Sequence, residues 1–402
     1  MEKEQKSRKK NKVKTIINKV YSGFDFTLLI CVLCLMTFGI IVIYTATSQK
    51  YGMIYLKSQV FYSAIALLGL IFFLVVDYHV WYRFGKLYYW AAIVSIFLVK
   101  VIPANVKNGA LRSIKIGPVT ISVVELAKTF MIMFFAYYMC NCYRKIKEGY
   151  QNEIFVVVLS AIVSALVYKI NNNLSTALII SGIGVSMLFV LKKHVKLFLV
   201  CMVIGVAGYI FAGKYSLKLG EDAKRADYLN AEQGNEKSEG NFRNERLLAW
   251  KNLDMVSEDK GYQTIHALYA IGSGGFIGKG LGNGSEKTIV PEAQNDMAYA
   301  IVCEEFGYWG SLFLLIAYMM LIWRIFWVAQ NAPDLYGSLI CTAVAMHLSI
   351  QVFLHMAVNV NFIPNTGVTL PFISSGGSAL IFTLAEIGLV LGVSGKIRLE
   401  DD

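Results

Sequence analysis

The sequence predicts an all-α, polytopic membrane protein with about ten transmembrane helices and a large extracellular loop between helices seven and eight. Of its 402 residues, 56% are hydrophobic and only 16% are charged, and the mean hydropathy is +0.53. This composition is too apolar for one soluble core. Its apolar runs of about 18 or more residues are long enough to cross a hydrocarbon layer of roughly 30 Å as helices.

Ten predicted spans follow one another along the chain, of which the third and the fifth are the shortest. A basic cytoplasmic tail at residues 1–24 precedes them, and residues 25–402 form a single membrane domain. We expect the spans at residues 26–45, 56–76, 87–102, 122–140, 153–169, 174–191, 195–213, 296–322, 337–358 and 376–394.

Lysine and arginine in the short loops predict the orientation, because these residues are retained on the cytoplasmic side of a membrane. Residues 1–24 hold eight basic side chains against two glutamates, which places the N-terminus inside. With ten spans, the C-terminus is also cytoplasmic. The exception is the predicted outer loop at 103–121, which carries Lys107, Arg112 and Lys115. A basic outer loop favours an anionic ligand, although a different span count would produce the same pattern.

The net charge of +11 needs no nucleic-acid partner. It follows largely from the cytoplasmic loops, and it attracts the N-terminal tail to anionic membrane lipid.

The large extracellular loop, predicted at residues 214–295, contains three kinds of sequence. Residues 214–246 are rich in charged and polar side chains and are expected to be solvated. From Arg246 the apolar spacing predicts a short amphipathic helix along the membrane interface. Residues 262–271 are apolar enough to form a re-entrant segment, which ends in a cluster of glycines. Irregular backbone at that depth requires cover by protein or a water-filled cavity, and an active site needs such a cavity.

The glycine-rich stretch at 272–284, GSGGFIGKGLGNG, is similar to a phosphate-binding loop but matches neither nucleotide motif. A P-loop requires Gly where residue 273 is Ser, and Ser or Thr where residue 280 is Gly. No strand precedes the stretch, as a Rossmann turn would require. Two interpretations remain open. The stretch is a flexible turn, or its backbone N–H groups approach a diphosphate while Lys279 or Lys287 adds positive charge.

Carboxylates cluster where the eighth span is predicted to begin. Pro291 can open a helix, after which Glu292 and Asp296 stand four residues apart on one face, near the outer mouth of the span. Carboxylates at that depth are costly without partners or a polar cavity. We therefore expect a functional role for Asp296, and structural ion pairs for Glu304 and Glu305.

The predicted outer loop between spans nine and ten, NVNFIPNTGVTLPFISSGGSAL from residue 359, combines prolines and glycines with hydroxyl and amide groups. It could line the same cavity as Asp296, although a turn-rich connector explains the composition equally well.

Several ionisable residues fall inside predicted spans. Glu125, Lys128 and Glu386 are most simply explained as satisfied intramembrane pairs. His347 and His355 have no further obvious ligand near them, so the sequence does not predict a metal site there.

Three segments together resemble one family: GYQTIHALYAIGSGGFIGKGLGNG, PEAQND followed by EEFG, and NTGVTLPFISSGGSA. In these the chain is similar to the shape, elongation, division and sporulation (SEDS) proteins, the family of RodA, FtsW and SpoVE. The resemblance implies a ten-span glycosyltransferase in the bacterial cytoplasmic membrane. Such an enzyme polymerises lipid II into undecaprenyl-diphosphate-linked glycan at the outer face, with a class B penicillin-binding protein as its partner, for elongation, division or sporulation.

The resemblance also assigns individual residues. The family's essential aspartate falls on Asp296, and its arginine in the outer loop after span three falls on Arg112. Ser113 stands where the family usually has Trp. The family's QPSE motif appears as SVVE at 122–125, and its QPDLGT motif appears as NNNLST at 171–176, where an amide replaces the carboxylate. These departures indicate a divergent branch.

The mechanistic hypothesis is that Asp296 acts as general base on an acceptor sugar hydroxyl. The hydroxyl attacks the anomeric carbon of a lipid-diphosphate donor with inversion. Arg112, Lys279 and Lys287 are candidates to stabilise the departing diphosphate, together with a divalent cation, Mg²⁺ or Mn²⁺. Glu292 would adjust the acidity of Asp296 or bind that cation. The remaining predicted substrate contacts are Gln263, Asn295, Thr366, Ser374 and Ser375.

Two other classes of function remain open. A lipid-linked precursor flippase or transporter would place charges along a continuous path across the membrane, whereas transfer chemistry concentrates them at one face. The predicted placement of Arg112, Lys287 and Asp296 at the outer face favours transfer. A non-catalytic scaffold for a transpeptidase is compatible with the altered motifs.

Overall fold

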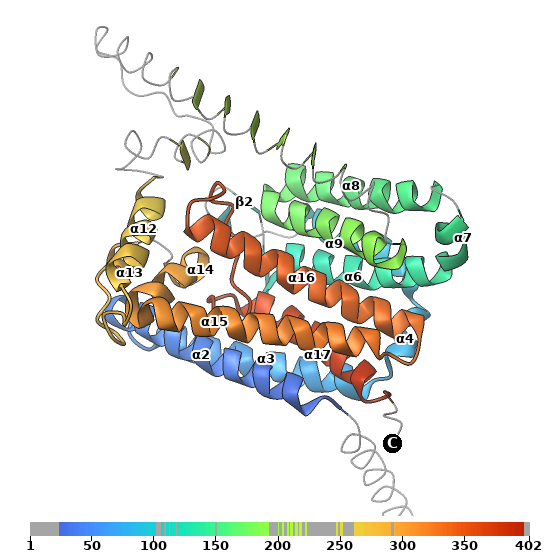
Figure 1. Ribbon diagram of the computed structural model, residues 1–402, viewed down its shortest axis with the longest axis horizontal. Helices are drawn as coiled ribbons and strands as arrows, with labels where there is room; N and C mark the ends of the chain where they lie inside the picture. The colour runs from blue at the N-terminus through green and yellow to red at the C-terminus, as the bar shows by residue number, and fades with distance from the viewer. Residues whose placement is uncertain are drawn as a thin grey trace, which may run out of the picture.

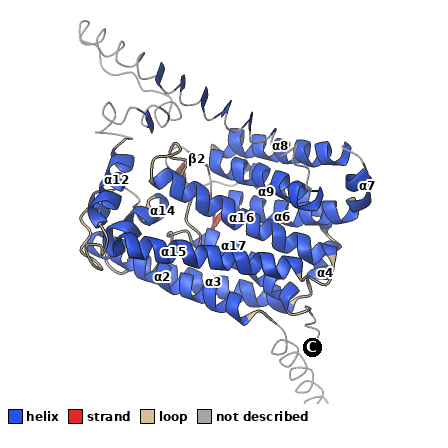
Figure 2. Ribbon diagram, in the orientation of Figure 1, coloured by secondary structure: helices blue, strands red, loops and turns tan. Residues whose placement is uncertain are grey.

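The protein is a bundle of long apolar helices with a few short strands (Figures 1 and 2). The computed structural model describes residues 24–101, 106–107, 110–111, 113–117, 119–148, 151–192, 261–290 and 293–397, with scattered positions between 200 and 251. Within these residues, 8 helices are long and apolar enough to span a membrane. They are α2 (Phe26–Tyr51), α3 (Ile54–Val75), α6 (Val123–Asn141), α8 (Gln151–Asn171), α9 (Leu174–Lys192), α15 (Ala298–Gln330), α16 (Leu335–Asn359) and α17 (Gly377–Ser394).

The predicted all-α membrane fold is therefore confirmed. A shorter apolar helix, α5 (Gly85–Val101), corresponds to the third predicted span. The seventh predicted span, 195–213, lies mostly outside the described residues, as do the N-terminal tail and most of the predicted loop at 214–260. Exposed side chains such as Leu68, Trp90 and Trp323 stand on the outside of the bundle, where lipid would cover them.

Helix α16 lies at the centre of the bundle. It packs against α6, α9, α15 and α17, while α17 also packs along α3. Most of its side chains are buried, including Gln351, His347 and His355. Its N-terminus is capped by Asp334, whose carboxylate accepts from Gly337 N at 2.8 Å. The buried polar side chains of this helix require hydrogen-bonding partners from neighbouring elements.

Both ends of the described chain lie at the same end of the bundle, opposite the short helices α12 (Tyr262–Gly274), α13 (Glu286–Ile289) and α14 (Ala293–Asp296) (Figure 1). Asp25 caps α2 through Leu28 N and pairs with Arg324 of α15 at 2.5 Å. The Asp25 backbone N–H also donates to Ser394 Oγ at 3.0 Å, near the end of α17. These contacts fix the first and last spans to each other at that end.

A second ion pair at this end joins Asp77, which follows α3, to Lys396 at 2.5 Å. Partial burial acts to raise the pKa of Asp77. Hydrogen bonds from Lys396 and His79 outweigh that effect and lower its pKa to about 2. The short helices α4 (Tyr78–Tyr82) and α7 (Tyr143–Glu148) lie near the same end of the bundle.

Two small hairpins, which the sequence did not predict, follow α5. Strands β1 (Val106–Lys107) and β2 (Ala110–Leu111) pair antiparallel, as do β3 (Ser113–Ile116) and β4 (Val119–Ser122). In the second hairpin Ser113 pairs with Ser122, directly before α6. The second hairpin therefore leads directly into α6.

The predicted re-entrant segment forms α12 (Tyr262–Gly274), which packs on α15. Its 13 residues are too few to span a bilayer. The glycine-rich stretch then runs against α15: Lys279 N donates to Glu304 O at 2.9 Å and Gly280 N to Glu305 O at 3.0 Å. At Gly278, φ is +85° and an added Cβ would lie 2.3 Å from the Glu305 carbonyl oxygen. Only glycine permits this approach.

The prediction that Asp296 opens the eighth span is wrong. Asp296 ends a separate single turn, α14 (Ala293–Asp296), and α15 begins at Ala298 after the non-helical Met297. Gly307, with φ of +65°, then interrupts α15. Pro291 and Glu292, which were predicted to share this helix, lie outside the described residues. Because of the break at Met297, Asp296 belongs to α14 and not to the first turn of α15.

Candidate functional site

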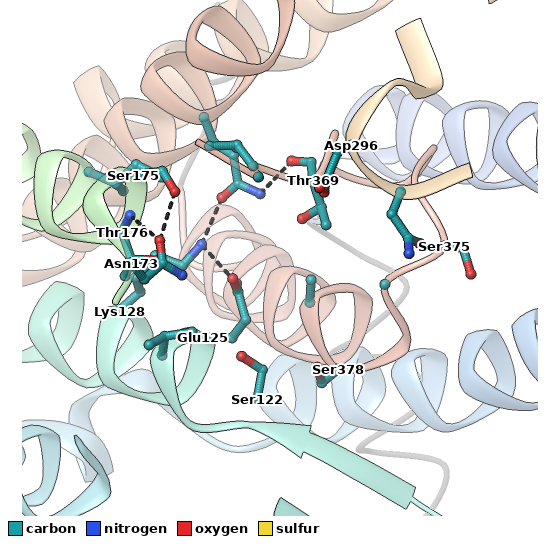
Figure 3. Close-up of a pocket in the computed structure, with 18 residues that line it drawn as sticks. Ser122, Glu125, Lys128, Asn173, Ser175, Thr176, Asp296, Thr369, Ser375 and Ser378 are labelled. Carbon is teal, nitrogen blue, oxygen red and sulfur yellow. Dashed lines mark hydrogen bonds and ion pairs between the residues drawn. The ribbon is translucent and has the colours of Figure 1, made fainter. Parts of the chain in front are cut away.

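A cavity of about 200 Å³ lies at the N-terminal ends of α6, α9 and α17, beside α14 and α16 (Figure 3). Asp296 lines it from α14, and Glu125 and Lys128 line it from α6. The segment from Gly367 to Gly376 lines another side, together with Gln351 of α16. The predicted essential acid thus opens onto a polar cavity and is not sealed among aliphatic side chains.

The end of α16 and the segment after it hold α14 in place through hydrogen bonds to the backbone of α14. Ser374 Oγ donates to Asn295 O at 2.6 Å, and Ser375 N donates to Gln294 O at 2.9 Å. Asn359 Nδ2 donates to Asp296 O at 3.1 Å. Three successive carbonyl groups of a single helical turn are therefore fixed by residues distant in sequence. This arrangement sets the position from which the Asp296 side chain enters the cavity.

Replacing Ser374 with alanine is expected to reduce activity without removing any group that contacts substrate. Ser374 Oγ also accepts from Leu370 N at 2.7 Å, so the change frees both the loop and α14. A misplacement near 1 Å can cost about 100-fold in rate. We expect a loss of about 10- to 100-fold in the rate of the reaction proposed below, at unchanged protein yield. Ser349→Ala is the control, because the Ser349 hydroxyl donates to Ala345 O within α16 at 2.7 Å and neither lines the cavity nor contacts α14 among the described interactions.

Lys128 is the buried cation of the cavity, with a side chain 2% exposed. Its Nζ lies 2.8 Å from Glu125 Oε2 and donates to Gln351 Oε1 at 2.8 Å. The predicted intramembrane pairing of Glu125 and Lys128 is confirmed. Sequence reasoning missed that both side chains face Asp296 across the cavity. The available signal was their spacing of three residues, which places them on one helix face.

The two altered family motifs meet at the same cavity. Ser122 and Glu125 come from the first, and Asn173, Ser175 and Thr176 come from the second (Figure 3). Asn173 Oδ1 accepts from Thr176 N at 3.1 Å and from Ser175 Oγ at 2.7 Å. The amide thus caps α9, as an aspartate could, without adding a negative charge to the cavity.

The N-terminal ends of the helices around the cavity favour the binding of an anion. Helices α6, α9 and α17 all begin there, with Val124, Thr176 and Ser378 of their first turns among the lining residues. A helix N-terminus carries partial positive charge and unpaired N–H groups. Lys128, however, is already paired with Glu125. With Asp296 ionised, these three side chains carry a net negative charge, so a dianionic ligand needs further positive charge.

The two lysines predicted to contact a diphosphate are bound elsewhere. Lys279 Nζ lies 2.7 Å from Glu304 Oε1, and Lys287 Nζ lies 2.8 Å from Glu305 Oε1. Neither lysine lines the cavity. The structural ion pairs that the sequence predicted for Glu304 and Glu305 are confirmed.

The loop's backbone N–H groups are also engaged. Glu304 Oε1 accepts from Ser285 N at 2.8 Å and from Glu286 N at 3.1 Å, and Glu305 Oε1 accepts from Gly282 N at 3.3 Å. The glycine-rich stretch therefore encloses two carboxylates of α15, and the structural interpretation of this stretch is favoured over the phosphate-binding one.

The other predicted contacts divide into three groups. Asn295 and Ser375 line the cavity. Gln263 accepts from Asn365 Nδ2 at 3.0 Å, and Thr366 and Ser374 are buried, but none of these three residues lines it. Arg112 and Glu292 lie outside the described residues and remain predictions.

The described part of the chain contains no group of three or more His, Cys, Asp or Glu side chains placed to hold a metal ion. The cavity itself offers two carboxylates, Asp296 and Glu125. Mg²⁺ commonly binds proteins through one or two carboxylates and takes its remaining ligands from substrate phosphates and water. The cavity therefore fits a cation that arrives with a phosphate ligand.

Comparison with known proteins covers nearly the whole chain. The family model described as cell cycle protein, for FtsW, RodA and SpoVE, matches residues 26–398. Stage V sporulation protein E of Bacillus subtilis is 31% identical over 389 residues, which cover 93% of this chain and 98% of that protein. A probable peptidoglycan glycosyltransferase FtsW of Geobacter sp. is 29% identical over 388 residues, with coverage of 94% and 98%.

Solved structures show the same fold. The rod shape determining protein RodA of Thermus thermophilus matches with a TM-score of 0.64 at 22% identity, over 94% of this chain and 99% of that one. A chain of a peptidoglycan synthase complex that coordinates polymerization and crosslinking matches with a TM-score of 0.71 at 22% identity, over 95% and 100%. The chain therefore belongs to the SEDS family of multi-pass membrane proteins, the family of FtsW, RodA and SpoVE.

Proposed function

We propose that this protein is a peptidoglycan glycosyltransferase that polymerises lipid II into glycan strands at the outer face of the cytoplasmic membrane. The observation that carries the proposal is the cavity in which Asp296 faces Glu125 and Lys128 at the N-terminal ends of three helices. Membership of the family and the naming of a relative as a probable peptidoglycan glycosyltransferase support it. Both termini are then cytoplasmic, at the end of the bundle opposite Asp296.

In the proposed reaction, Asp296 takes the proton from an acceptor sugar hydroxyl. The hydroxyl oxygen forms a bond to the anomeric carbon of the lipid-linked donor, and the bond from that carbon to the diphosphate oxygen breaks. The diphosphate leaves with the electron pair, and the anomeric configuration inverts because the hydroxyl attacks from the side opposite the leaving group. A positioned general base contributes about 10²- to 10⁴-fold to such a rate. Inversion requires base and leaving group on opposite sides of the sugar.

The leaving diphosphate is stabilised by Lys128 and the helix N-termini around the cavity. Because Glu125 already neutralises Lys128, the proposal assigns additional positive charge to Arg112 and to a divalent cation. Glu125 is the described cavity residue that would hold this cation, because Asp296 acts as the base on the opposite side of the sugar. When bound, it would supply positive charge to the diphosphate oxygens.

Chelation tests the cation. Treatment of the purified protein with EDTA is expected to lower the rate of glycan formation at least about tenfold. Adding back Mg²⁺ or Mn²⁺ is expected to restore it, whereas Na⁺ at matched ionic strength is not. An undiminished rate after exhaustive chelation would remove the cation from the proposal.

We further propose a class B penicillin-binding protein as partner, which crosslinks the strands made here. The similarity to a chain of a peptidoglycan synthase complex supports a partnered arrangement. Elongation, division and sporulation are the candidate processes.

Reconstituted vesicles separate the proposed function from its rivals. Purified protein and lipid II alone are expected to yield glycan strands on a gel, with added transpeptidase altering rate or crosslinking only. Movement of lipid II between leaflets without polymer would indicate a transporter. Polymer that forms only when a polymerising partner is supplied would indicate a scaffold.

A further inference from the structure

Two buried ionisable side chains, His347 of α16 and Glu386 of α17, lie beside the cavity but do not line it. Their exposed fractions are 1% and 0%, and His347 Nδ1 lies 2.7 Å from Glu386 Oε2. The proposed chemistry does not use either group. A buried carboxylate inside a membrane bundle is costly unless its partners compensate, so the contacts of the pair indicate what it does.

The second ring nitrogen of His347 contacts Lys128, the buried cation of the cavity. His347 Nε2 lies 3.2 Å from Lys128 Nζ and 2.8 Å from Gln351 Oε1. Because the Glu386 carboxylate accepts, it holds a proton on Nδ1. Nε2 then accepts from the Lys128 ammonium or, when protonated, donates to the Gln351 amide. Both arrangements join Lys128, His347 and Gln351 into one hydrogen-bonded unit.

Glu386 also binds the residue next to Lys128. Thr129 Oγ1 donates to Glu386 Oε1 at 2.7 Å. Consecutive residues of an α-helix point about 100° apart around its axis. The Glu386 carboxylate therefore fixes two residues that point in different directions from α6. It binds Thr129 directly and Lys128 through His347. The first turns of α6 cannot rotate without breaking one of these contacts.

We propose that His347 and Glu386 are positioning residues that hold the Lys128 ammonium at the cavity, facing the diphosphate of the donor. Gln351, fixed by its own hydrogen bond to Thr369 O at 3.0 Å, completes the support. The inference rests on the proposed function, since it gives the pair a task only if an anionic leaving group forms in this cavity.

The test removes both members of the pair together. A single substitution would leave the other group buried without its partner and could prevent folding, whereas His347→Leu with Glu386→Leu leaves no unpaired charge. The double variant is expected to elute and melt as the native protein does. Its kcat for lipid II polymerisation is expected to fall at least about tenfold, with KM within about threefold, because the lost contact acts on the departing diphosphate.

Two further variants keep the result interpretable. Asp25→Asn with Arg324→Gln removes a partly buried ion pair at the opposite end of the bundle and is expected to leave kcat unchanged. His347→Gln retains one donor and one acceptor and is expected to recover most of the kcat that the double leucine variant loses.

Thr129→Val keeps every charge paired. It removes the second contact of Glu386, together with the longer bond from Thr129 Oγ1 to Glu125 O at 3.3 Å within α6; we expect kcat to fall about threefold to tenfold. Unchanged kcat in the double leucine variant overturns the inference. If that variant does not fold, unchanged kcat in Thr129→Val overturns it. If the native protein makes no polymer, the proposed function itself is wrong. That outcome differs from one in which the native protein is active and the variants keep its kcat, which contradicts the further inference alone.

Discussion

Asp296→Asn is expected to lower kcat for glycan polymerisation by about 10²- to 10⁴-fold, the usual contribution of a positioned general base. The amide is nearly the same size as the carboxyl group but cannot take a proton from the acceptor hydroxyl. The three backbone contacts to α14 through Asn359, Ser374 and Ser375 do not involve the Asp296 side chain. The variant should therefore fold, and KM for lipid II should change little.

The matched control is Asp77→Asn, the same chemical change at the other end of the bundle. Asp77 pairs with Lys396 there and lines no part of the cavity, so polymerisation should continue at the native rate. An Asp296→Asn protein that melts as the native one does and still elongates glycan at a comparable rate would remove Asp296 from the mechanism.

Lys287→Met is expected to destabilise the protein by about 3–5 kcal/mol, the usual cost of breaking a buried ion pair by removing one partner. The side chains of Lys287 and Glu305 are both 0% exposed. Removing the lysine leaves the Glu305 carboxylate of α15 buried, with Gly282 N as its one remaining donor among the described hydrogen bonds. Thermal unfolding in detergent should show a lower midpoint, with activity per folded molecule preserved.

Two comparisons sharpen this result. Lys279→Met should cost less, because the Lys279 side chain is 29% exposed and Glu304 keeps its bonds from Ser285 N and Glu286 N. Lys287→Met combined with Glu305→Gln should regain much of the lost stability, because no buried charge remains unpaired. A Lys287→Met protein of native stability but raised KM for lipid II would restore the substrate-binding role that the sequence suggested.

The sequence predicted most of the fold because membrane spans are encoded locally. Apolar runs long enough to cross a bilayer correspond to α2, α3, α6, α8 and α9, and to the three spans after residue 296. Asp296 and the segment after α16 could also be assigned to a common site. Carboxylates inside a predicted span, and clusters of glycine and proline, indicate such sites in the sequence without any knowledge of tertiary contacts.

The rest of the site depends on contacts between helices that are distant in sequence. Glu386 meets His347 and Thr129 across separations of 39 and 257 residues, which no local periodicity records. The pairing of Lys287 with Glu305 likewise appears only when the glycine-rich stretch folds against α15. The turn at Met297 was missed because its flanking residues are all compatible with a helix.

The central claim is that the donor diphosphate lies in the cavity between Asp296 and Lys128. Photocrosslinking with an undecaprenyl-diphosphate sugar that carries a photoreactive group beside the diphosphate tests this most directly. The account predicts labelled peptides from the start of α6, the start of α9 or residues 367–379. Labelling confined to residues 275–287, around Lys279 and Lys287, would contradict it.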